Sequence, residues 1–209
     1  MTHPLLPQLR AARVIPVVRT SDARLAALAV EWLRGAGLTI FEITLTVPDA
    51  IGLIRALSAD PALTIGAGTV PDQATAEACL AAGARFLVAP WVDPAVAHAA
   101  RGAGAVSMLG AMTPTEVRAA LAAGADVVKL FPASSAGGPA HVKALRAVFP
   151  DVAFCPTGGV DARNAPDYLA AGAAFVGIGG RLVDEGLLRN GDRAGIEAAA
   201  RDVLGLKQA

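Results

Sequence analysis

The pentapeptide LAAGA occurs three times in the sequence, at residues 80–84, 121–125 and 169–173. Each copy ends an Ala-rich stretch of helical composition and is followed within a few residues by a short apolar run. A glycine after a helix is the usual left-handed cap, and an apolar run after that cap is typical of a buried parallel strand. Each copy therefore marks one helix-to-strand step of a repeating unit.

The related tetrapeptide RGAG, at 34–37 and 101–104, marks two further steps of the same kind. Alternating strands and helices favour a parallel sheet over a solenoid, and eight pairs close a barrel. We therefore expect one α/β domain over residues 1–209, a (β/α)8 TIM barrel; a doubly wound open sheet is the alternative. Counting the steps predicts strands near 14–19, 39–45, 63–68, 86–90, 106–110, 127–132, 153–157 and 175–179. The helices are predicted near 22–35, 48–59, 72–82, 94–102, 114–123, 139–148, 164–171 and 193–204.

Two details near the N-terminus refine this fold. Pro16 falls inside the first predicted strand, where it removes a hydrogen-bond donor from the ladder, so we expect a bulge or a short strand. The segment before residue 12 is expected to add a short helix across the bottom of the barrel.

Composition limits the class of protein. Hydrophobic residues make up 54% of the chain and charged residues 17%, where an average soluble domain has roughly 25% charged residues. The apolar excess lies in Ala-rich helices, and no apolar run reaches the roughly 18 residues of a membrane span. The first residues lack the pattern of a secretory signal, so we expect a cytoplasmic protein.

Charge and cysteine usage restrict the partners. The formal net charge is zero and the sequence has no basic stripe, so we expect neither nucleic acid nor an anionic membrane as a partner. Cys79 and Cys155 have no framework or metal spacing and are interpreted as buried free thiols. The helices carry few charges to cover their surfaces, which predicts apolar patches and hence a homo-oligomer.

Three ionisable residues fall in or at the end of strands that should be buried on both faces. Arg19 ends the first predicted strand, Glu42 lies within the second, and Lys129 lies within the sixth, in the apolar context VVKLF. A buried ammonium group must pair or lose its proton. One interpretation is therefore a structural ion pair between Lys129 and Glu42 inside the barrel.

The other interpretation is catalytic. Burial favours the neutral amine of a lysine, which can attack a ketone and form an imine. The other lysines, Lys143 and Lys207, fall on a helix and in the tail, in solvated settings. By elimination, imine chemistry is assigned to Lys129, and Glu42 is assigned the proton shuttle.

Glycine-rich turns follow two of the last strands. TGGV at 157–160 follows the seventh strand and GIGG at 177–180 follows the eighth, and in such barrels these two loops commonly bind a phosphate through backbone N–H groups. Turns that merely need glycine are the alternative. GAGT at 66–69 follows the third strand, and its amides and the Thr69 hydroxyl are candidates for binding a carboxylate with Arg19. The histidines, His3, His98 and His141, lack ligand spacing, so no metal site is predicted.

Four motifs carry a resemblance: FEITLTVPDA at 41–50, GAGT at 66–69, VKLFPA at 128–133 and FCPTGGV at 154–160. Together they resemble the 2-keto-3-deoxy-6-phosphogluconate (KDPG) aldolases, a family that also includes 4-hydroxy-2-oxoglutarate (KHG) aldolases. The resemblance extends over nearly the whole chain. It implies a (β/α)8 barrel, usually trimeric, that cleaves a 2-keto-3-deoxy sugar acid phosphate to pyruvate and glyceraldehyde 3-phosphate without metal or organic cofactor.

The resemblance also implies roles for single residues. Lys129 would be the Schiff-base lysine and Glu42 the proton shuttle, while Thr69 would contact the carboxylate. Pro90 and Phe131 would be pocket walls, and Thr157 would contact substrate hydroxyls. Phosphate would be bound by Gly158 and Gly159 and by the loop at Gly179 and Gly180.

The chain departs from the family pattern at two positions. Thr46 stands where many members have an arginine, and in other members, as here, the arginine ends the first strand, so Arg19 is assigned the carboxylate. Gly180 stands where the family usually offers a serine to the phosphate, and the adjacent Arg181 is a candidate to compensate.

Three rival functions stay open at this level. The first is an aldolase that acts on KHG or on the 6-phosphogalactonate epimer. The second is a phosphosugar isomerase or epimerase on the same barrel, with Glu42 as base and no imine. The third is a non-catalytic binding or scaffold barrel, which gives no reason for a lysine within the sixth strand.

Overall fold

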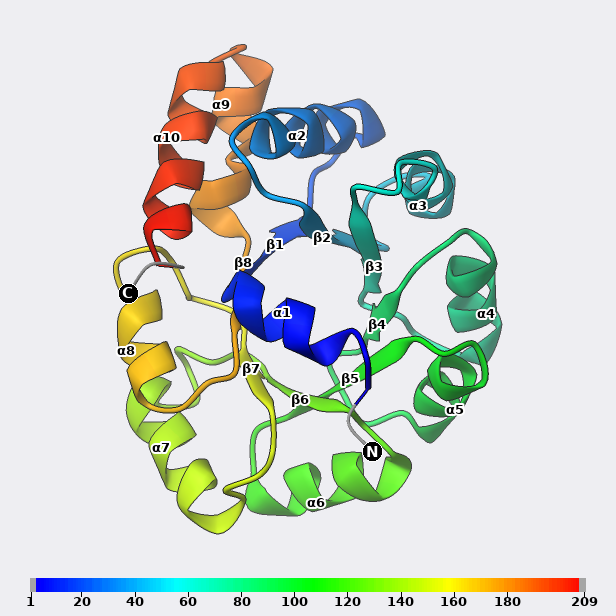
Figure 1. Ribbon diagram of the computed structural model, residues 1–209, viewed down its shortest axis with the longest axis vertical. Helices are drawn as coiled ribbons and strands as arrows, with labels where there is room; N and C mark the ends of the chain where they lie inside the picture. The colour runs from blue at the N-terminus through cyan, green and yellow to red at the C-terminus, as the bar shows by residue number, and fades with distance from the viewer. Residues whose placement is uncertain (1–2, 207–209) are drawn as a thin grey trace.

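The computed structural model describes residues 3–206, so residues 1–2 and 207–209 of the predicted domain, Lys207 among them, lie outside the described residues. A ring of parallel strands lies at the centre and helices surround it, which confirms the predicted barrel (Figure 1). The strands are β1 Val14–Val18, β2 Ile40–Thr44, β3 Thr64–Gly68, β4 Phe86–Val88, β5 Val106–Ala111, β6 Val127–Leu130, β7 Phe154–Pro156 and β8 Val176–Ile178.

The helices occupy the predicted places with small shifts at their ends. They are α2 Ala23–Gly35, α3 Ala50–Ser58, α4 Gln73–Ala81, α5 Pro94–Gly102, α6 Pro114–Ala123, α7 Gly138–Val148, α8 Ala165–Ala170 and α10 Arg193–Gly205. Two short elements between β8 and α10 were not predicted, the 3-10 helix η1 Gly180–Val183 and the helix α9 Glu185–Arg189.

The strand order β7-β6-β5-β4-β3-β2-β1-β8 brings the first and last strands together. β1 pairs with β8 at Val14↔Val176 and Ile15↔Gly177. β7 and β8 are joined by the single bridge Thr157↔Gly177, so the barrel closes at a narrow seam beside the glycine-rich loops.

One of the two details expected near the N-terminus is present. α1 Leu6–Ala12 crosses the N-terminal end of the barrel, at the centre of the ring in Figure 1, where the buried Leu6 and Leu9 pack on the interior. The other expectation is wrong: β1 has five residues, as many as β2 and β3, and Pro16 lies within it in register with Ile178 of β8. The register to β2 begins only at Val17, after the proline that lacks an N–H donor.

Side chains alternate between the two sides of the barrel wall. Outward residues such as Phe41, Ile43 and Leu109 join the layer between strands and helices. Inward residues such as Ile40, Phe86 and Met108 form a second cluster with α1. By the same alternation Glu42, Thr44 and Lys129 face the interior.

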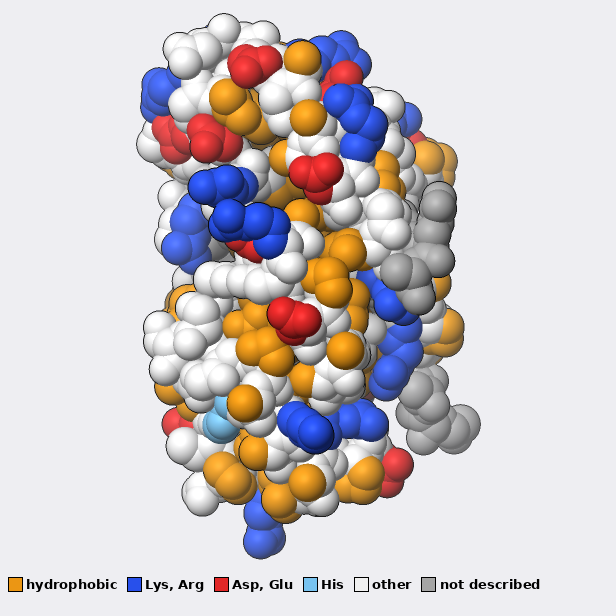
Figure 2. Space-filling model, turned by 90° about the vertical axis from the view of Figure 1, so that its left-hand side faces the viewer, with side chains coloured by type: hydrophobic (Ala, Val, Ile, Leu, Met, Phe, Trp, Pro, Cys, Tyr) orange, Lys and Arg blue, Asp and Glu red, His pale blue; other side chains and the backbone are white. Residues whose placement is uncertain are grey.

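The surface over α7, α8 and α10 carries acidic and basic side chains interspersed with hydrophobic ones (Figure 2). Among residues 3–206, no helix is long and apolar enough to cross a membrane.

Candidate active site

The two charged residues predicted inside the barrel lie together. Lys129 Nζ is 3.9 Å from Glu42 Oε1, and each side chain is only 6% exposed. A charge-assisted hydrogen bond between such groups measures about 2.7–2.9 Å, so the two groups face each other without bonding directly. A buried ion pair stabilises a fold only with excellent geometry, which this pair does not have.

Two glycines on neighbouring strands make room for Glu42 and for the chain after β4. A Cβ at Gly68 of β3 would collide with the Glu42 carboxylate. Gly110 of β5 is the register partner of Lys129, and a Cβ there would collide with the backbone of Pro90 and Trp91. The side chains missing at these inward positions leave space for one catalytic candidate and for the chain after β4.

The surroundings of Lys129 are apolar. The Phe131 ring lies with its centre 5.2 Å from Lys129 Nζ. Cys155 of β7 is the register partner on the other side, and burial raises the pKa of its thiol to about 12. The thiol therefore stays protonated, which leaves Lys129 as the candidate nucleophile of this layer.

Pro90 and Phe131, the predicted pocket walls, line one hollow of about 370 Å³. Gly110 lies in the same hollow and its N–H donates to the carbonyl oxygen of Trp91. The two walls thus meet beside the strand position that is in register with Lys129.

Most of the predicted substrate contacts line a second cavity, of about 340 Å³. It brings together the end of β1, the end of β6 and the loops after β7 and β8, which are distant in sequence. Its predicted members are Arg19, Phe131, Thr157, Gly158, Gly159, Gly179 and Gly180.

The loop after β7 is held by the loop after β6. The amides of Ala133 and Ser134 donate to the carbonyl oxygens of Thr157 and Gly158. Gly158 and Gly159 have φ of +91° and +73°, a backbone region that favours glycine. A Cβ at Gly159 would also collide with the Ser134 side chain, so this position requires glycine on two grounds.

Charge in this cavity is contributed by Arg19, Arg181 and Asp161. Arg19 continues the inward row of Ile15 and Val17 and is exposed at the end of β1. Hydrogen bonds, first of all from the Arg163 side chain, lower the pKa of Asp161, which stays a carboxylate. Arg163 Nη2 lies 2.9 Å from Asp161 Oδ2, and this ion pair neutralises the carboxylate. Arg19 and Arg181 then give the cavity a positive charge, which suits an anion.

Thr69 lines neither of these two hollows but a third one. It has φ of +61° and lies with Leu45, Thr46 and Pro71 in a space of about 450 Å³ between the loops after β2 and β3. The structure therefore separates Thr69 from the glycine-rich loops and also from Arg19, which lines the cavity of those loops, so the two residues assigned to the carboxylate do not share a hollow.

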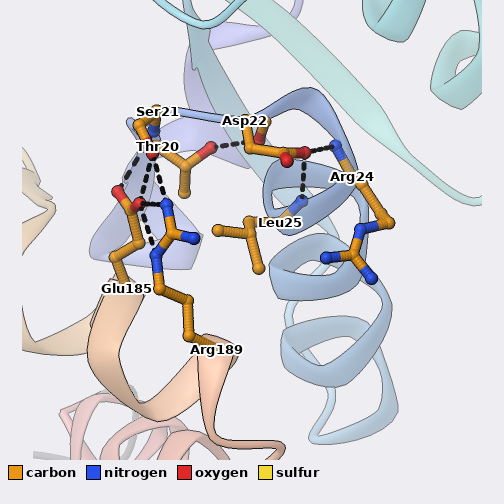
Figure 3. Close-up of polar contacts among 7 residues, drawn as sticks. All are labelled: Thr20, Ser21, Asp22, Arg24, Leu25, Glu185 and Arg189. Carbon is orange, nitrogen blue, oxygen red and sulfur yellow. Dashed lines mark hydrogen bonds and ion pairs between the residues drawn. The ribbon is translucent and has the colours of Figure 1, made fainter.

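A polar clamp joins the loop that carries Arg19 to the segment after β8 (Figure 3). Glu185 of α9 accepts hydrogen bonds from the amide and hydroxyl of Ser21, and Arg189 Nη2 donates to Ser21 Oγ at 2.7 Å. Bonds from the Ser21 hydroxyl, Arg189 and the Ser21 amide lower the pKa of Glu185 from 4.5 to about 2. The stabilising effect of the clamp is therefore complete above about pH 4.5 and is lost as the pH falls through about 2.

A larger cavity, about 490 Å³, lies outside the barrel between η1, α9 and α10. It shares Asp161 and Arg181 with the cavity of the glycine-rich loops, but none of the inward charged residues reaches it. We place the candidate site inside the barrel mouth because the Lys129–Glu42 pair lies there. Within residues 3–206, no group of three His, Cys, Asp or Glu side chains is arranged to hold a metal ion.

The comparisons with known proteins agree on one family. The sequence model of the KDPG and KHG aldolase family matches residues 6–199. The chain is 38% identical over 197 residues to a 2-dehydro-3-deoxy-phosphogluconate aldolase of Pseudomonas aeruginosa, covering 93% of this chain and 89% of that protein. It is 41% identical over 187 residues to a probable 2-dehydro-3-deoxy-6-phosphogalactonate aldolase of Rhizobium meliloti, with coverages of 88% and 87%.

A solved structure gives the same result. The KDPG aldolase of Legionella pneumophila, with pyruvate captured as a covalent carbinolamine, is similar with a TM-score of 0.86 at 34% identity. The similarity covers 95% of this chain and 97% of that one.

Proposed function

The chain belongs to the KDPG and KHG aldolase family of class I aldolases, which are carbon–carbon lyases, and from that membership we propose that it cleaves 2-keto-3-deoxy-6-phosphogluconate to pyruvate and glyceraldehyde 3-phosphate. The observation that carries the proposal is the buried Lys129 facing Glu42 at 3.9 Å. A lysine in this position has little structural value, because the pair is too long for a direct hydrogen bond.

Imine formation is the first part of the proposed course. Lys129 Nζ adds to the C2 ketone of the substrate, and Glu42 donates a proton to the resulting hydroxyl, which leaves as water. The protonated imine is then an electron sink for the bond between C3 and C4. The course needs no metal or organic cofactor.

Carbon–carbon bond cleavage and product release complete the proposed reaction. Glu42 accepts the proton of the C4 hydroxyl while the C3–C4 electron pair moves into the enamine, and glyceraldehyde 3-phosphate departs. Protonation of the enamine and hydrolysis of the imine release pyruvate and free Lys129.

The substrate-binding roles are proposed from the family resemblance; the structure places Arg19 with Thr157 and the glycine-rich loops, and Thr69 in a separate hollow. Thr69 and Arg19 bind the carboxylate, and Thr157 contacts a hydroxyl. Pro90 and Phe131 pack against the carbon chain. Gly158, Gly159, Gly179 and Gly180 offer backbone N–H groups to the phosphate, and Arg181 supplies the charge in place of a serine.

Two close alternatives concern the substrate rather than the chemistry. The relative named as a probable 6-phosphogalactonate aldolase is 41% identical to the chain, so the epimer is one alternative. Unphosphorylated 4-hydroxy-2-oxoglutarate is the other, since the family model includes KHG aldolases. Relative kcat/KM values for the three substrates decide among them.

Borohydride trapping tests the imine. The protein is treated with pyruvate and sodium borohydride and then analysed by peptide mass spectrometry. We expect one reduced three-carbon adduct, on Lys129, because the exposed Lys143 of α7 has no comparable environment. Lys129→Ala is expected to give no adduct and no cleavage while remaining folded.

A label on Lys143 or Lys207, with Lys129 unmodified, would remove the imine assignment. No label at all would favour the isomerase or epimerase alternative, in which Glu42 acts as a base without an imine.

We also propose a homo-oligomer, with a trimer as the resemblance implies. Trp91, next to the pocket wall Pro90, is 47% exposed, which suits an interface position better than a solvated one. Light scattering of the purified protein tests the trimer. The cytoplasmic location and the single domain over 1–209 stay predictions.

A further inference from the structure

Thr44, the last residue of β2, has a buried hydroxyl group with no hydrogen-bond partner among the residues that the structure describes. The residue is 0% exposed. Buried hydroxyl groups in folded proteins are nearly always bonded, because an unbonded one has lost its water without replacement. The hydroxyl at this position therefore calls for an explanation.

The direction of the side chain is given by the strand. Phe41 and Ile43 join the outer layer, so Glu42 and Thr44 both face the barrel interior. Thr44 lies two residues nearer the barrel mouth than Glu42, on the side where substrate enters.

The register places this hydroxyl close to the Glu42 carboxylate. Thr44 is paired with Gly68 of β3, and the Glu42 carboxylate occupies the position that a Cβ of Gly68 would take. The hydroxyl and the carboxylate therefore both lie beside Gly68. Lys129 Nζ lies 3.9 Å from Glu42 Oε1.

We propose that Thr44 holds, together with Glu42, the water molecule that leaves when the imine forms and returns when it is hydrolysed. This inference rests on the proposed function. No part of the imine chemistry described above assigns a residue other than Glu42 to that water.

The C2–O bond of the carbinolamine breaks, the proton of Glu42 goes to the departing oxygen, and the Lys129 nitrogen lone pair forms the C=N bond. The water produced accepts a hydrogen bond from the Thr44 hydroxyl and donates one to the Glu42 carboxylate. In hydrolysis the same water attacks C2 with its free lone pair, and Glu42 takes its proton.

The test compares variants that differ in one hydroxyl. Thr44→Val keeps the shape of the side chain, Thr44→Ala removes the hydroxyl by a second route, and Thr44→Ser restores it. Thr64→Val is the matched control, since Thr64 is a buried threonine of β3 whose hydroxyl accepts from Gln8 near the closed end of the barrel. The rate of imine formation is measured by rapid quenching of protein and pyruvate into borohydride, with thermal unfolding recorded for each variant.

We expect Thr44→Val and Thr44→Ala to slow imine formation roughly tenfold, the loss expected from one hydrogen bond to a reacting group. Thr44→Val should keep or raise the Tm, because the substitution removes a buried hydroxyl that has no hydrogen-bond partner and therefore destabilises the fold. Thr44→Ser should recover most of the rate, and Thr64→Val should form the imine at the wild-type rate.

An unchanged rate in a folded Thr44→Val or Thr44→Ala variant, alongside normal labelling of the wild type, overturns this inference alone. Absence of the Lys129 adduct in the wild type overturns the proposed function itself, and the inference with it. A fall in Tm with an unchanged rate would show a purely structural threonine.

Discussion

The two ends of the barrel interior are built from the same eight strands but from opposite kinds of side chain. At the N-terminal end Ile40, Phe86 and Phe175 fill the interior together with Leu9 of α1. Towards the C-terminal end some inward positions are held by glycines such as Gly68, Gly110 and Gly177, whose space is taken by Glu42, by the backbone of Pro90 and Trp91, and by Thr157. Lys129 lies near Glu42 at this end.

This difference separates stability from chemistry along the barrel axis. Large apolar side chains at one end bury area and hold the strands together. Glycines at the other end give up that contribution and admit charged groups, backbone and ligand. Changes at the C-terminal end should therefore alter rate with little effect on stability, and changes at the N-terminal end should do the reverse.

Glu42→Gln should give the largest effect at the reactive end. The amide keeps the shape of the side chain but cannot shuttle a proton, so turnover should fall roughly 10²- to 10⁴-fold. Steady-state kinetics check the rate and thermal unfolding checks the fold, with Glu77→Gln, on the exposed face of α4, as the control. Turnover within a few-fold of wild type would make Glu42 structural and would require another base.

Phe86→Ala is the converse experiment at the closed end. Phe86 is 0% exposed, and removal of a buried phenylalanine costs about 3–5 kcal/mol of unfolding free energy. Denaturant unfolding measures this loss, and Val148→Ala, at a side chain 62% exposed, should by comparison change little. The kcat of the folded fraction should stay within a few-fold of wild type. A loss of kcat as large as that of Glu42→Gln would mean that the two ends are not separate.

Two arginines at the C-terminal end of the barrel are assigned to different anionic groups of the substrate, Arg19 to the carboxylate and Arg181 to the phosphate. Arg19→Ala should lower kcat/KM roughly 10- to 100-fold for phosphorylated and unphosphorylated substrates alike, since the carboxylate is common to both. Arg181→Ala should lower it by a similar factor only for phosphorylated substrates. These variants test the anion sites better than Gly159→Val, because a side chain at Gly159 would meet Ser134 and an unfavourable φ.

Arg118→Ala, on the exposed face of α6, is the control for loss of a positive charge. Equal losses on both substrate classes in Arg181→Ala would move the function towards 4-hydroxy-2-oxoglutarate. If Arg19→Ala spared both classes, Thr69 and its loop would hold the carboxylate alone.

The barrel could be predicted from sequence because its repeats are local. Each LAAGA segment caps one helix and introduces one strand, so the strands were placed to within about two residues, the uncertainty usual for element ends. η1 and α9 have no signal in the sequence, because helices of four and five residues have too few turns for a periodic pattern.

The sequence alone indicates a candidate site residue only where its type is unusual for the predicted element in which it lies. Lys129 and Glu42 are conspicuous as charges in apolar strands, and the paired glycines as a cluster. Thr44 gives no such signal, because threonine is common in strands and its missing partner is visible only in three dimensions. The clamp of Ser21 with Glu185 joins loops from opposite ends of the sequence, and no local pattern connects them.

The pairing of β1 with β8 has a consequence for synthesis on the ribosome. β1 is made first among the strands, yet one of its two neighbours is the last strand to emerge. Until then the apolar edge of β1 has no partner on that side, and an open edge of this kind invites pairing between nascent chains. The protein therefore depends on completion of nearly the whole described sequence before its first strand is protected.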